Sequence, residues 1–359
     1  MTPLADLLTR QIAAQGPIPI AEYMAHCMGH PEHGYYVTRD PLGAAGDFTT
    51  APEVSQMFGE LIGLALAQAW LDQGRPTPFI LAELGPGRGT LMADLLRATA
   101  KVPGFREGAR LHLVEGSPVL RGVQARGIGE PRFHDTVADL PDAPLFLIAN
   151  EFFDALPIRQ FLRAGDGWRE RVVGLDGARL TFGLTVPAPL ALLEHRLADT
   201  AEGDLVETCP ALPGIAGEIG RRIAAHGGAA LIVDYGAARS LGDTLQAVSG
   251  HDRTHPLAAP GEADLSAHVD FGALAAALAP AQPSKLTDQG IFLERLGITG
   301  RARQLAGALA GAALDSHIAA HRRLTHPEEM GQLFKVLGAT PPGAPPLPGL
   351  AHDARHHHG

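Results

Sequence analysis

A glycine-rich segment is the first part of the sequence whose residue types and spacing could do chemistry. It reads Glu83-Leu84-Gly85-Pro86-Gly87-Arg88-Gly89-Thr90 and follows a short, continuously apolar run that begins at Phe79. An apolar run that leads into glycines is typical of a buried strand followed by a tight turn and a helix. Glycines let the backbone adopt positive φ and let a ligand approach closely, while the free N–H groups of the helix start favour an anionic or polar ligand group.

Three interpretations of this loop are open. A dinucleotide-binding loop with the spacing GxGxxG would need a glycine at position 90, where the sequence has Thr90. The observed GxGxG spacing, with an acidic residue before it, resembles the loop of Rossmann-like methyltransferases that use S-adenosylmethionine, a cofactor with an ammonium and a carboxylate but no pyrophosphate. An ordinary tight turn without a ligand is the third. We favour the methyltransferase interpretation, which assigns four residues to the cofactor: Glu83, Gly85, Gly87 and Gly89.

Acidic residues also follow the next two expected strands. Glu115 comes after the run Leu111-His112-Leu113-Val114, and a carboxylate there can accept hydrogen bonds from both ribose hydroxyls of an adenosine. Asp135 follows Arg132-Phe133-His134 and could lie near the adenine amino group. The alternatives are a helix-capping or solvated Glu115 and an Asp135 in an exposed turn.

The segment from Leu145 to Pro157 carries residues that could assist a methyl transfer. A buried strand here ends in Asn150-Glu151-Phe152-Phe153-Asp154, and ligands of doubly wound sheets bind beyond the carboxyl ends of the strands. A guanidinium or amine acceptor needs a carboxylate that orients it and takes up its proton. Glu151 and Asp154 are therefore candidate catalytic residues, and Asn150 could orient substrate or hold cofactor. Both carboxylates could instead cap the helix that follows.

Further candidates lie later in the chain. Asp234-Tyr235-Gly236 ends another apolar run and could face the same cleft. His268 titrates near neutrality and could act as a catalytic acid or base, although an isolated histidine is more often structural or a capping partner. The other histidines match no zinc motif, so we expect no metal site.

Strand and helix signals alternate around these residues. Short apolar runs end near residues 84, 115, 134, 149 and 234, and helical periodicity separates them. The alternation predicts an α/β fold with a Rossmann-like class I methyltransferase core, an N-terminal helical segment and an inserted α+β cap. We expect the N-terminal segment at 1–75, the first part of the core at 76–158, the cap at 159–227, the rest of the core at 228–340 and an irregular tail at 341–359. Within these ranges we expect one helix from Pro52 to about Gln73, and antiparallel strands followed by two helical stretches in the cap.

The composition limits the class of protein. Of the 359 residues, 45% are hydrophobic, enough for a buried core, and no apolar run approaches the roughly 20 residues that span a bilayer. The net charge of −10 argues against a nucleic-acid partner, because phosphate binding needs positive charge. Two distant cysteines, Cys27 and Cys209, and an N-terminus without a secretory or transit pattern predict a reducing, cytoplasmic location.

The chain resembles the MidA-like family of methyltransferases, which includes the mitochondrial protein arginine methyltransferase needed to assemble respiratory complex I. Beside the glycine loop, the segments that carry the resemblance are His30 to Tyr36, Gly46 to Glu60, Asn150 to Pro157 and Asp264 to Phe271. The resemblance implies S-adenosylmethionine as cofactor, a protein arginine as methyl acceptor, and a complex I subunit of the 49-kDa type or its bacterial counterpart as target. It also places the run from Gly46 to Gln56 over the cofactor, with Thr50, Pro52 and Ser55 as binding residues. Taken alone, this run reads as a polar loop that feeds a helix capped by Thr50 or Ser55.

Two other functions are compatible with the sequence. One is methyl transfer to a small molecule, because an acidic cleft and a cap would serve either acceptor. The other is a catalytically silent assembly chaperone that binds the cofactor and docks a folding subunit through its cap. The sequence also leaves the oligomeric state open, a homodimer included.

Overall fold

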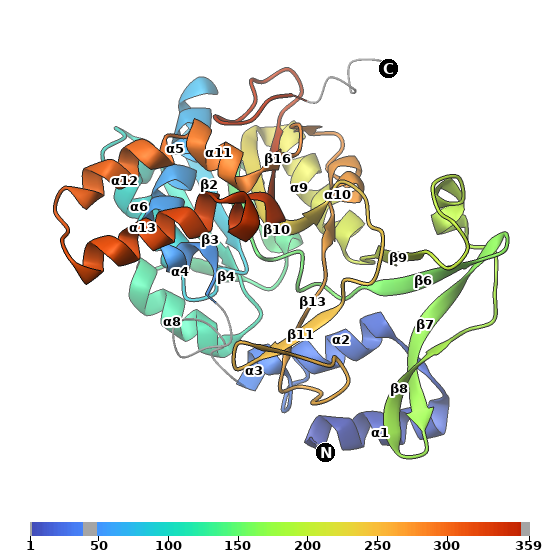
Figure 1. Ribbon diagram of the computed structural model, residues 1–359. Helices are drawn as coiled ribbons and strands as arrows, with labels where there is room; N and C mark the ends of the chain where they lie inside the picture. The colour runs from blue at the N-terminus through green and yellow to red at the C-terminus, as the bar shows by residue number, and fades with distance from the viewer. Residues whose placement is uncertain (1, 39–48, 353–359) are drawn as a thin grey trace.

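A mainly parallel sheet forms the centre of the molecule (Figure 1). The computed structural model describes residues 2–38 and 49–352. The strand order is β15-β17-β10-β5-β2-β3-β4, with β14 beside β10 and β16 beside β17. Neighbouring strands from β10 to β4 are parallel, whereas β17 runs antiparallel to β10. The strands are β2 (Phe79–Leu84), β3 (Ala109–Val114), β4 (Arg132–His134), β5 (Leu145–Asn150), β10 (Gly228–Ala237), β14 (Val269–Asp270), β15 (Gln282–Pro283), β16 (Thr287–Asp288) and β17 (Phe334–Thr340).

The strand order changes direction between β2 and β5. From β2 the chain moves outward to β3 and β4, then crosses back to β5 and continues on the other side to β10. Every residue of β2 and β5 is buried, in keeping with sequences that are apolar except for Glu83 and Asn150 near their carboxyl ends. The predicted α/β fold is therefore confirmed, and a ligand crevice is expected where the carboxyl ends of β2 and β5 diverge.

Helices cover both faces of this sheet. One face packs against α5 (Gln56–Asp72) and α6 (Thr90–Thr99) through Phe58, Leu66 and Leu91. The other face packs against α9 (Leu212–His226) and α10 (Phe271–Ala277) through Ile219 and Leu274. Among the described residues, no helix is both long and apolar enough to cross a lipid bilayer. The other helices around the core are α4 (Ala51–Val54), α7 (Phe105–Gly108), α8 (Pro118–Ile128), η1 (Val137–Asp139), α11 (Gln289–Arg295), α12 (Ile298–Ala306), α13 (Ala312–Thr325) and η3 (Pro327–Gly331).

An antiparallel sheet projects from this core, with α1 and α2 beside it (Figure 1). Its strand order is β1-β7-β6-β9, with β8 beside β7, and a smaller sheet has the order β12-β11-β13. An apolar cluster joins the helices to both sheets, since it contains Leu4 and Tyr23 together with Val173 and Leu265. We call this assembly the cap. Its elements are α1 (Pro3–Gln15), β1 (Ile18–Pro19), α2 (Ile20–Gly29), α3 (Tyr35–Thr38), β6 (Arg159–Ala164), β7 (Gly167–Asp176), β8 (Arg179–Leu184), η2 (Ala191–Arg196), β9 (Leu205–Thr208), β11 (Gln246–Ser249), β12 (Asp252–Thr254) and β13 (Asp264–Ser266).

The cap is assembled from three parts of the chain, which differs from the predicted ranges. Within 1–75, α1 and α2 pack on the cap sheets, whereas α5 packs on the central sheet. Within 159–227, α9 packs on the central sheet, and within 228–340, β11 and β13 pack in the cap. Periodicity shows that a segment is amphipathic, but it does not show which neighbour covers the apolar face.

Two local predictions also differ from the structure. The helix expected from Pro52 to about Gln73 is divided into α4 and α5, because Ser55 between them is extended, with φ −163° and ψ 138°. Its hydroxyl accepts a hydrogen bond from the backbone N–H of Met57 and so caps α5. Of the two helical stretches expected in the cap, one is the 3-10 turn η2 and the other is α9, which packs on the central sheet; the unpredicted edge strand β9 lies between them in the chain.

The close approach of α9 to α10 depends on Gly220. A Cβ added at this position would lie 1.8 Å from the carbonyl oxygen of Leu278, the C-cap of α10. Alanine normally stabilises a helix relative to glycine by up to about 1 kcal/mol, but here it would force the helices apart. We predict that Gly220→Ala lowers the free energy of unfolding by about 2 kcal/mol, measured by urea denaturation.

Gly214 provides the matched control in the same helix, because a Cβ there would meet nothing within 4 Å. We expect Gly214→Ala to leave the free energy of unfolding unchanged or to raise it by up to about 1 kcal/mol. Equal stabilities of the two variants would contradict the packing described for α9.

Candidate active site

A cavity of about 660 Å³ lies at the carboxyl ends of β2, β3 and β5. Residues of the central sheet form one side of it, and Met28 and Tyr36 from α2 and α3 form part of the other. The predicted site residues that line it are Thr50, Pro52, Glu83, Gly85, Gly87, Glu115, Asp135, Asn150 and Glu151. Four other predicted residues do not line it: Ser55, Gly89, Asp154 and His268.

The glycine loop has left-handed backbone at each of its glycines. The φ angles are 58° at Gly85, 54° at Gly87 and 83° at Gly89, a region that side chains with a Cβ rarely adopt. Gly89 is the N-cap of α6, and a Cβ there would lie 2.3 Å from Cδ1 of Ile128. Gly85 and Gly87 therefore shape the cavity wall, whereas Gly89 allows close packing behind it.

The buried carboxyl of Glu83 faces the cavity at the end of β2. Burial, and in addition the nearby Glu115, raise the pKa of this carboxyl well above its usual range. Oε2 of Glu83 and Oδ1 of Asn150 are buried, and neither has a hydrogen-bond partner among the described residues. Buried acceptors are normally paired, so these two oxygens fit a ligand that brings N–H groups or positive charge.

Glu115 directly follows β3 and is held by its neighbours. Its carboxylate accepts hydrogen bonds from the backbone N–H of Ser117 (2.8 Å) and from Nε2 of Gln124 (3.1 Å). Gln124 also donates to the carbonyl of Gly87 (2.6 Å), so one side chain ties the glycine loop to Glu115. Burial raises the pKa of Glu115, and the bonds from Ser117 and Gln124 lower it in part.

The side chain of Asp135 pairs with Arg121 and is 82% exposed. Arg121 also donates to the carbonyls of Glu115 (2.7 Å) and His134 (3.1 Å), so it joins the ends of β3 and β4. The carboxylate that we expect at the adenine amino group thus already has a cationic partner, although the residue itself lines the cavity.

Two hydrogen bonds attach α4 to the loops that form the cavity. The hydroxyl of Thr90, which follows the glycine loop, donates to Glu53 (2.6 Å). The backbone N–H of Ala51 donates to Oε1 of Glu151 (3.1 Å). Thr50 and Pro52 are thereby placed on the cavity wall. The predicted run over the cofactor begins at Gly46, but residues 46–48 lie outside the described part of the chain.

Glu151 lies at the end of β5 with a left-handed φ of 51°. Its backbone N–H donates to the carbonyl of Val233 (2.9 Å), and its Oε1 also accepts from Nδ2 of Asn150 (3.1 Å). Burial raises the pKa of its carboxyl to about 7, and the charge of Asp154 adds to the effect. Backbone strain of this kind costs of order 1–3 kcal/mol and persists where the surroundings enforce it, commonly at functional sites.

Asp234, which we expect to face the cleft, is instead fully buried behind the segment that carries Glu151. Its Oδ2 accepts hydrogen bonds from the backbone N–H groups of Phe153 (3.0 Å) and Asp154 (3.2 Å), and its Oδ1 accepts from that of Tyr235 (2.9 Å). Asp154 is buried outside the cavity wall, where burial raises the pKa of its carboxyl to about 6 and a hydrogen bond from Tyr235 lowers it. Asp234 therefore fixes the backbone of Asp154 and of the segment that follows Glu151.

His268 does not line the cavity and lies behind Tyr235, which hydrogen-bonds to Asp154. Its backbone N–H donates to the hydroxyl of Thr244 (2.8 Å), and its ring meets the ring of Tyr235 edge to face at 5.4 Å between centroids. Burial, with Arg253 nearby, lowers the pKa of His268. Its imidazole is therefore neutral at pH 7. It contacts Tyr235 and does not line the cavity, so any effect on a ligand would be indirect.

Several residues of the cavity wall are not among the site residues expected from the sequence. Tyr36 belongs to the His30-to-Tyr36 motif, so the motif was the available signal for it. Thr136, Val137 and Ile215 also line the cavity, but they come from stretches without a distinctive pattern. Their positions depend on how η1 and α9 pack against the core, and this packing cannot be predicted from the local sequence.

The site as a whole is acidic and buried. The carboxyls of Glu83, Glu115, Glu151 and Asp154 all have pKa values raised by burial. A nearby positive charge favours the ionised form of a carboxyl, so a cationic ligand would offset this penalty. The sulfonium and ammonium groups of S-adenosylmethionine match this requirement, and a planar guanidinium is a second cation that carboxylates bind well.

Comparisons with known proteins agree with this chemistry. The sequence model of a family of S-adenosyl-L-methionine-dependent methyltransferases matches residues 61–287. The chain is 36% identical to the mitochondrial protein arginine methyltransferase NDUFAF7 of Homo sapiens, over 95% of this chain and 84% of that protein. It is 37% identical to the protein of the same name from Danio rerio, over 92% of this chain and 85% of that protein.

A solved structure of similar fold comes from Burkholderia thailandensis. It is a crystal structure of a COG1565 superfamily member bound to S-adenosyl-homocysteine, with a TM-score of 0.79 and 30% identity over 99% of this chain and 94% of that one. The match of the family model, the identity to the curated relatives and the shared fold agree with one another. The chain belongs to the family of S-adenosyl-L-methionine-dependent methyltransferases that this sequence model describes.

Proposed function

We propose that the protein transfers the methyl group of S-adenosylmethionine to an arginine side chain of another protein. The relatives from Homo sapiens and Danio rerio are named protein arginine methyltransferases. The observation that carries the proposal is Glu151, a carboxylate on the cavity wall with further buried carboxylates behind it. A guanidinium is always cationic and presents a planar set of donors that a carboxylate can orient.

The cofactor is proposed to bind along the carboxyl ends of β2 and β3. Glu83 would hold the methionine ammonium beside Gly85 and Gly87. Glu115 would accept hydrogen bonds from the ribose hydroxyls. The stretch that begins at Asp135 would face the adenine, because β4 lies beyond β3 in the sheet order. Thr50, Pro52 and Asn150 complete this wall, while Ser55 and Gly89 support it from the starts of α5 and α6. When bound, the cofactor supplies an activated methyl group.

The acceptor is proposed to bind at Glu151. Its carboxylate would orient the guanidinium and take up the proton that the methylated nitrogen loses. Asp154 would act on the carboxylate of Glu151 without lining the cavity, because its negative charge contributes to the raised pKa of Glu151. His268 stands further back and contacts Tyr235, which hydrogen-bonds to Asp154.

For the partner, we propose a respiratory complex I subunit of the 49-kDa type or its bacterial counterpart. The support is the likeness to the MidA-like family over nearly the whole chain. We also propose a cytoplasmic location, since both cysteines are free, which fits a reducing compartment. A homodimer is a further proposal, for which sedimentation velocity is the direct test.

The variant Glu83→Gln keeps the size of the side chain and removes its charge. We expect the affinity for S-adenosylhomocysteine to fall about tenfold or more, because hydrogen bonds to charged groups contribute about 1.5–3 kcal/mol. Isothermal titration calorimetry measures the change. The exposed Glu130→Gln is the control and should bind like the wild type; a Glu83→Gln variant that also does so would refute the role given to Glu83.

Activity should rise with pH through the titration of Glu151. Its pKa is raised to about 7, so the carboxyl is protonated below that pH and loses its attraction for a guanidinium. We expect kcat/KM for an arginine peptide to fall on acidification with an apparent pKa at or below about 7, since the cationic cofactor favours the ionised form.

The variant Glu151→Gln provides the comparison for this profile. It should lower kcat/KM about 100-fold and remove the acidic limb of the pH profile. An acidic limb that persists unchanged in Glu151→Gln would assign the titration to another group.

The class of acceptor can be tested with tritiated cofactor and an extract of cells that lack the protein. We expect a labelled protein band on a gel with the wild type and none with Gly87→Val, whose branched side chain is strained at φ 54°. Label found only in the small-molecule fraction would favour a small-molecule acceptor. Complex assembly that survives Gly87→Val in cells would favour a chaperone without catalysis.

A further inference from the structure

The segment 136–142, which follows β4, forms part of the cavity wall near Glu115. Thr136 and Val137 line the cavity, and Val137 and Leu140 are buried in the core below it. The segment includes η1, and inside it the side chain of Asp139 accepts hydrogen bonds from the backbone N–H and the hydroxyl of Thr136, both at 2.9 Å. The backbone position of this segment therefore decides the shape of the wall.

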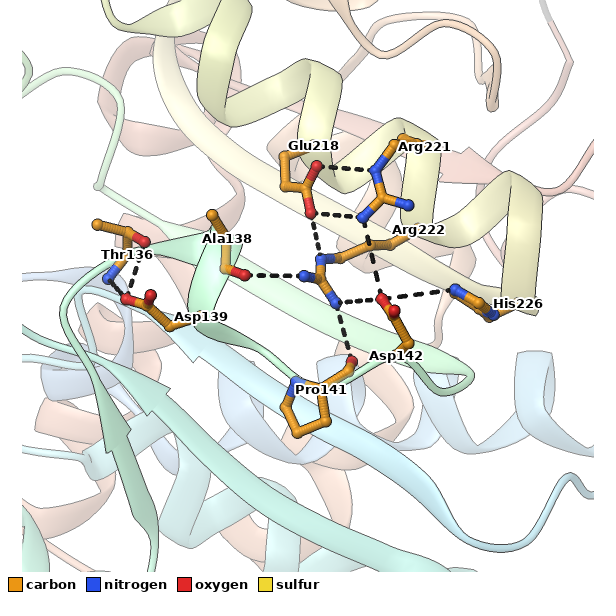
Figure 2. A network of polar contacts seen from close by, with 9 residues as sticks. All are labelled: Thr136, Ala138, Asp139, Pro141, Asp142, Glu218, Arg221, Arg222 and His226. Carbon is orange, nitrogen blue, oxygen red and sulfur yellow. Dashed lines mark hydrogen bonds and ion pairs between the residues drawn. The ribbon is translucent and has the colours of Figure 1, made fainter.

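A single guanidinium from α9 holds the carbonyls of this segment (Figure 2). Arg222 donates from Nη1 to the carbonyl of Pro141 (2.8 Å) and from Nη2 to the carbonyl of Ala138 (3.0 Å). Nη1 also meets Asp142 (3.3 Å), and Nε donates to Glu218 (2.7 Å). Arg222 is only 4% exposed, so these acceptors replace water around a buried charge.

The neighbouring arginine shows that this contact is specific. Arg221 also pairs with Glu218 (2.7 Å) and lies 3.9 Å from Asp142, but it is half exposed and bonds to no carbonyl of the segment. The helix that carries Arg222 also contributes Ile215 to the cavity wall. α9 therefore lines the cavity with one residue and fixes a second part of its wall with another.

We propose that Arg222 is a positioning residue of the cofactor site, which holds Thr136 and Val137 in place without touching the ligand. The proposal rests on the placement of the cofactor along β2, β3 and the segment after β4. Arginine suits this position because its planar guanidinium donates from three separate nitrogens, Nη1 and Nη2 to the two carbonyls and Nε to Glu218, whereas a lysine ammonium donates from a single nitrogen. The effect is on cofactor binding and not on the acceptor, because Glu151 is held from β10 and α4.

The test compares Arg222→Met and Arg222→Lys with the control Arg221→Met. Calorimetry gives the Kd for S-adenosylhomocysteine, and steady-state assays give the KM for each substrate and kcat at saturating cofactor. For Arg222→Met we expect Kd and cofactor KM to rise about tenfold, since the carbonyls of Ala138 and Pro141 lose the donor that holds the segment in place. We expect kcat and the acceptor KM to stay within about twofold of wild type, Arg222→Lys to be intermediate, and Arg221→Met to match wild type.

A structural role alone would give a different result. If Arg222→Met lowers Tm but keeps the wild-type Kd, or if kcat and the acceptor KM change as much as the cofactor KM, the proposal is wrong. If Arg222→Met does not fold, Asp139→Ala takes its place, because Asp139 is exposed and orders the same segment. It should weaken cofactor binding alone, and wild-type binding by both Asp139→Ala and Arg222→Lys would overturn the proposal. A wild-type protein that binds no S-adenosylhomocysteine would instead overturn the cofactor assignment, and the role of Arg222 with it.

Discussion

The parallel pairing of β2 with both β3 and β5 is the constraint on which the site depends. It brings the carboxyl ends of the three strands to one edge, so Glu83, Glu115 and Glu151 meet around one cavity. Buried carboxyls resist ionisation, and the pKa values of these three groups, raised first of all by burial, express this cost. A cationic ligand would offset this cost, so the proposed binding of a sulfonium and a guanidinium would follow from strand direction and burial.

The strain at Glu151 is balanced by β10, about 80 residues further along the chain. A left-handed backbone at a non-glycine residue needs support from its surroundings. The carbonyl of Val233 accepts the N–H of Glu151, and the carboxylate of Asp234 accepts the N–H groups of the two residues Phe153 and Asp154. A fully buried carboxylate is costly unless hydrogen bonds satisfy it, so Asp234 and the segment it holds stabilise each other.

The parts of the site that local patterns encode could be predicted from the sequence. The apolar runs of β2 and β5 and the glycines between β2 and α6 depend on short-range rules. Glu83, Asn150 and Glu151, which these patterns single out, lie on the cavity wall. Features that depend on distant partners could not be predicted. The sequence does not show that Asp135 pairs with Arg121, nor that two carbonyls some 80 residues before Arg222 will need donors. Hydrophobic periodicity likewise gave the helices but not which sheet each one covers.

One side of the cavity is formed by the core and the other by the cap. This division bears on which part of the protein could determine specificity for the methyl acceptor. Glu83, Glu115 and Glu151 come from the core, whereas Met28 and Tyr36 come from elements of the cap, where α2 shares an apolar cluster with β7 and β13. Burial, with Asp264 and Asp154 nearby, raises the pKa of the Tyr36 phenol well above its usual range, so the cap presents a neutral hydroxyl to an acidic core. If the core carboxylates bind the cofactor and the guanidinium as we propose, the residues that distinguish one acceptor from another would lie on the cap side of the cavity.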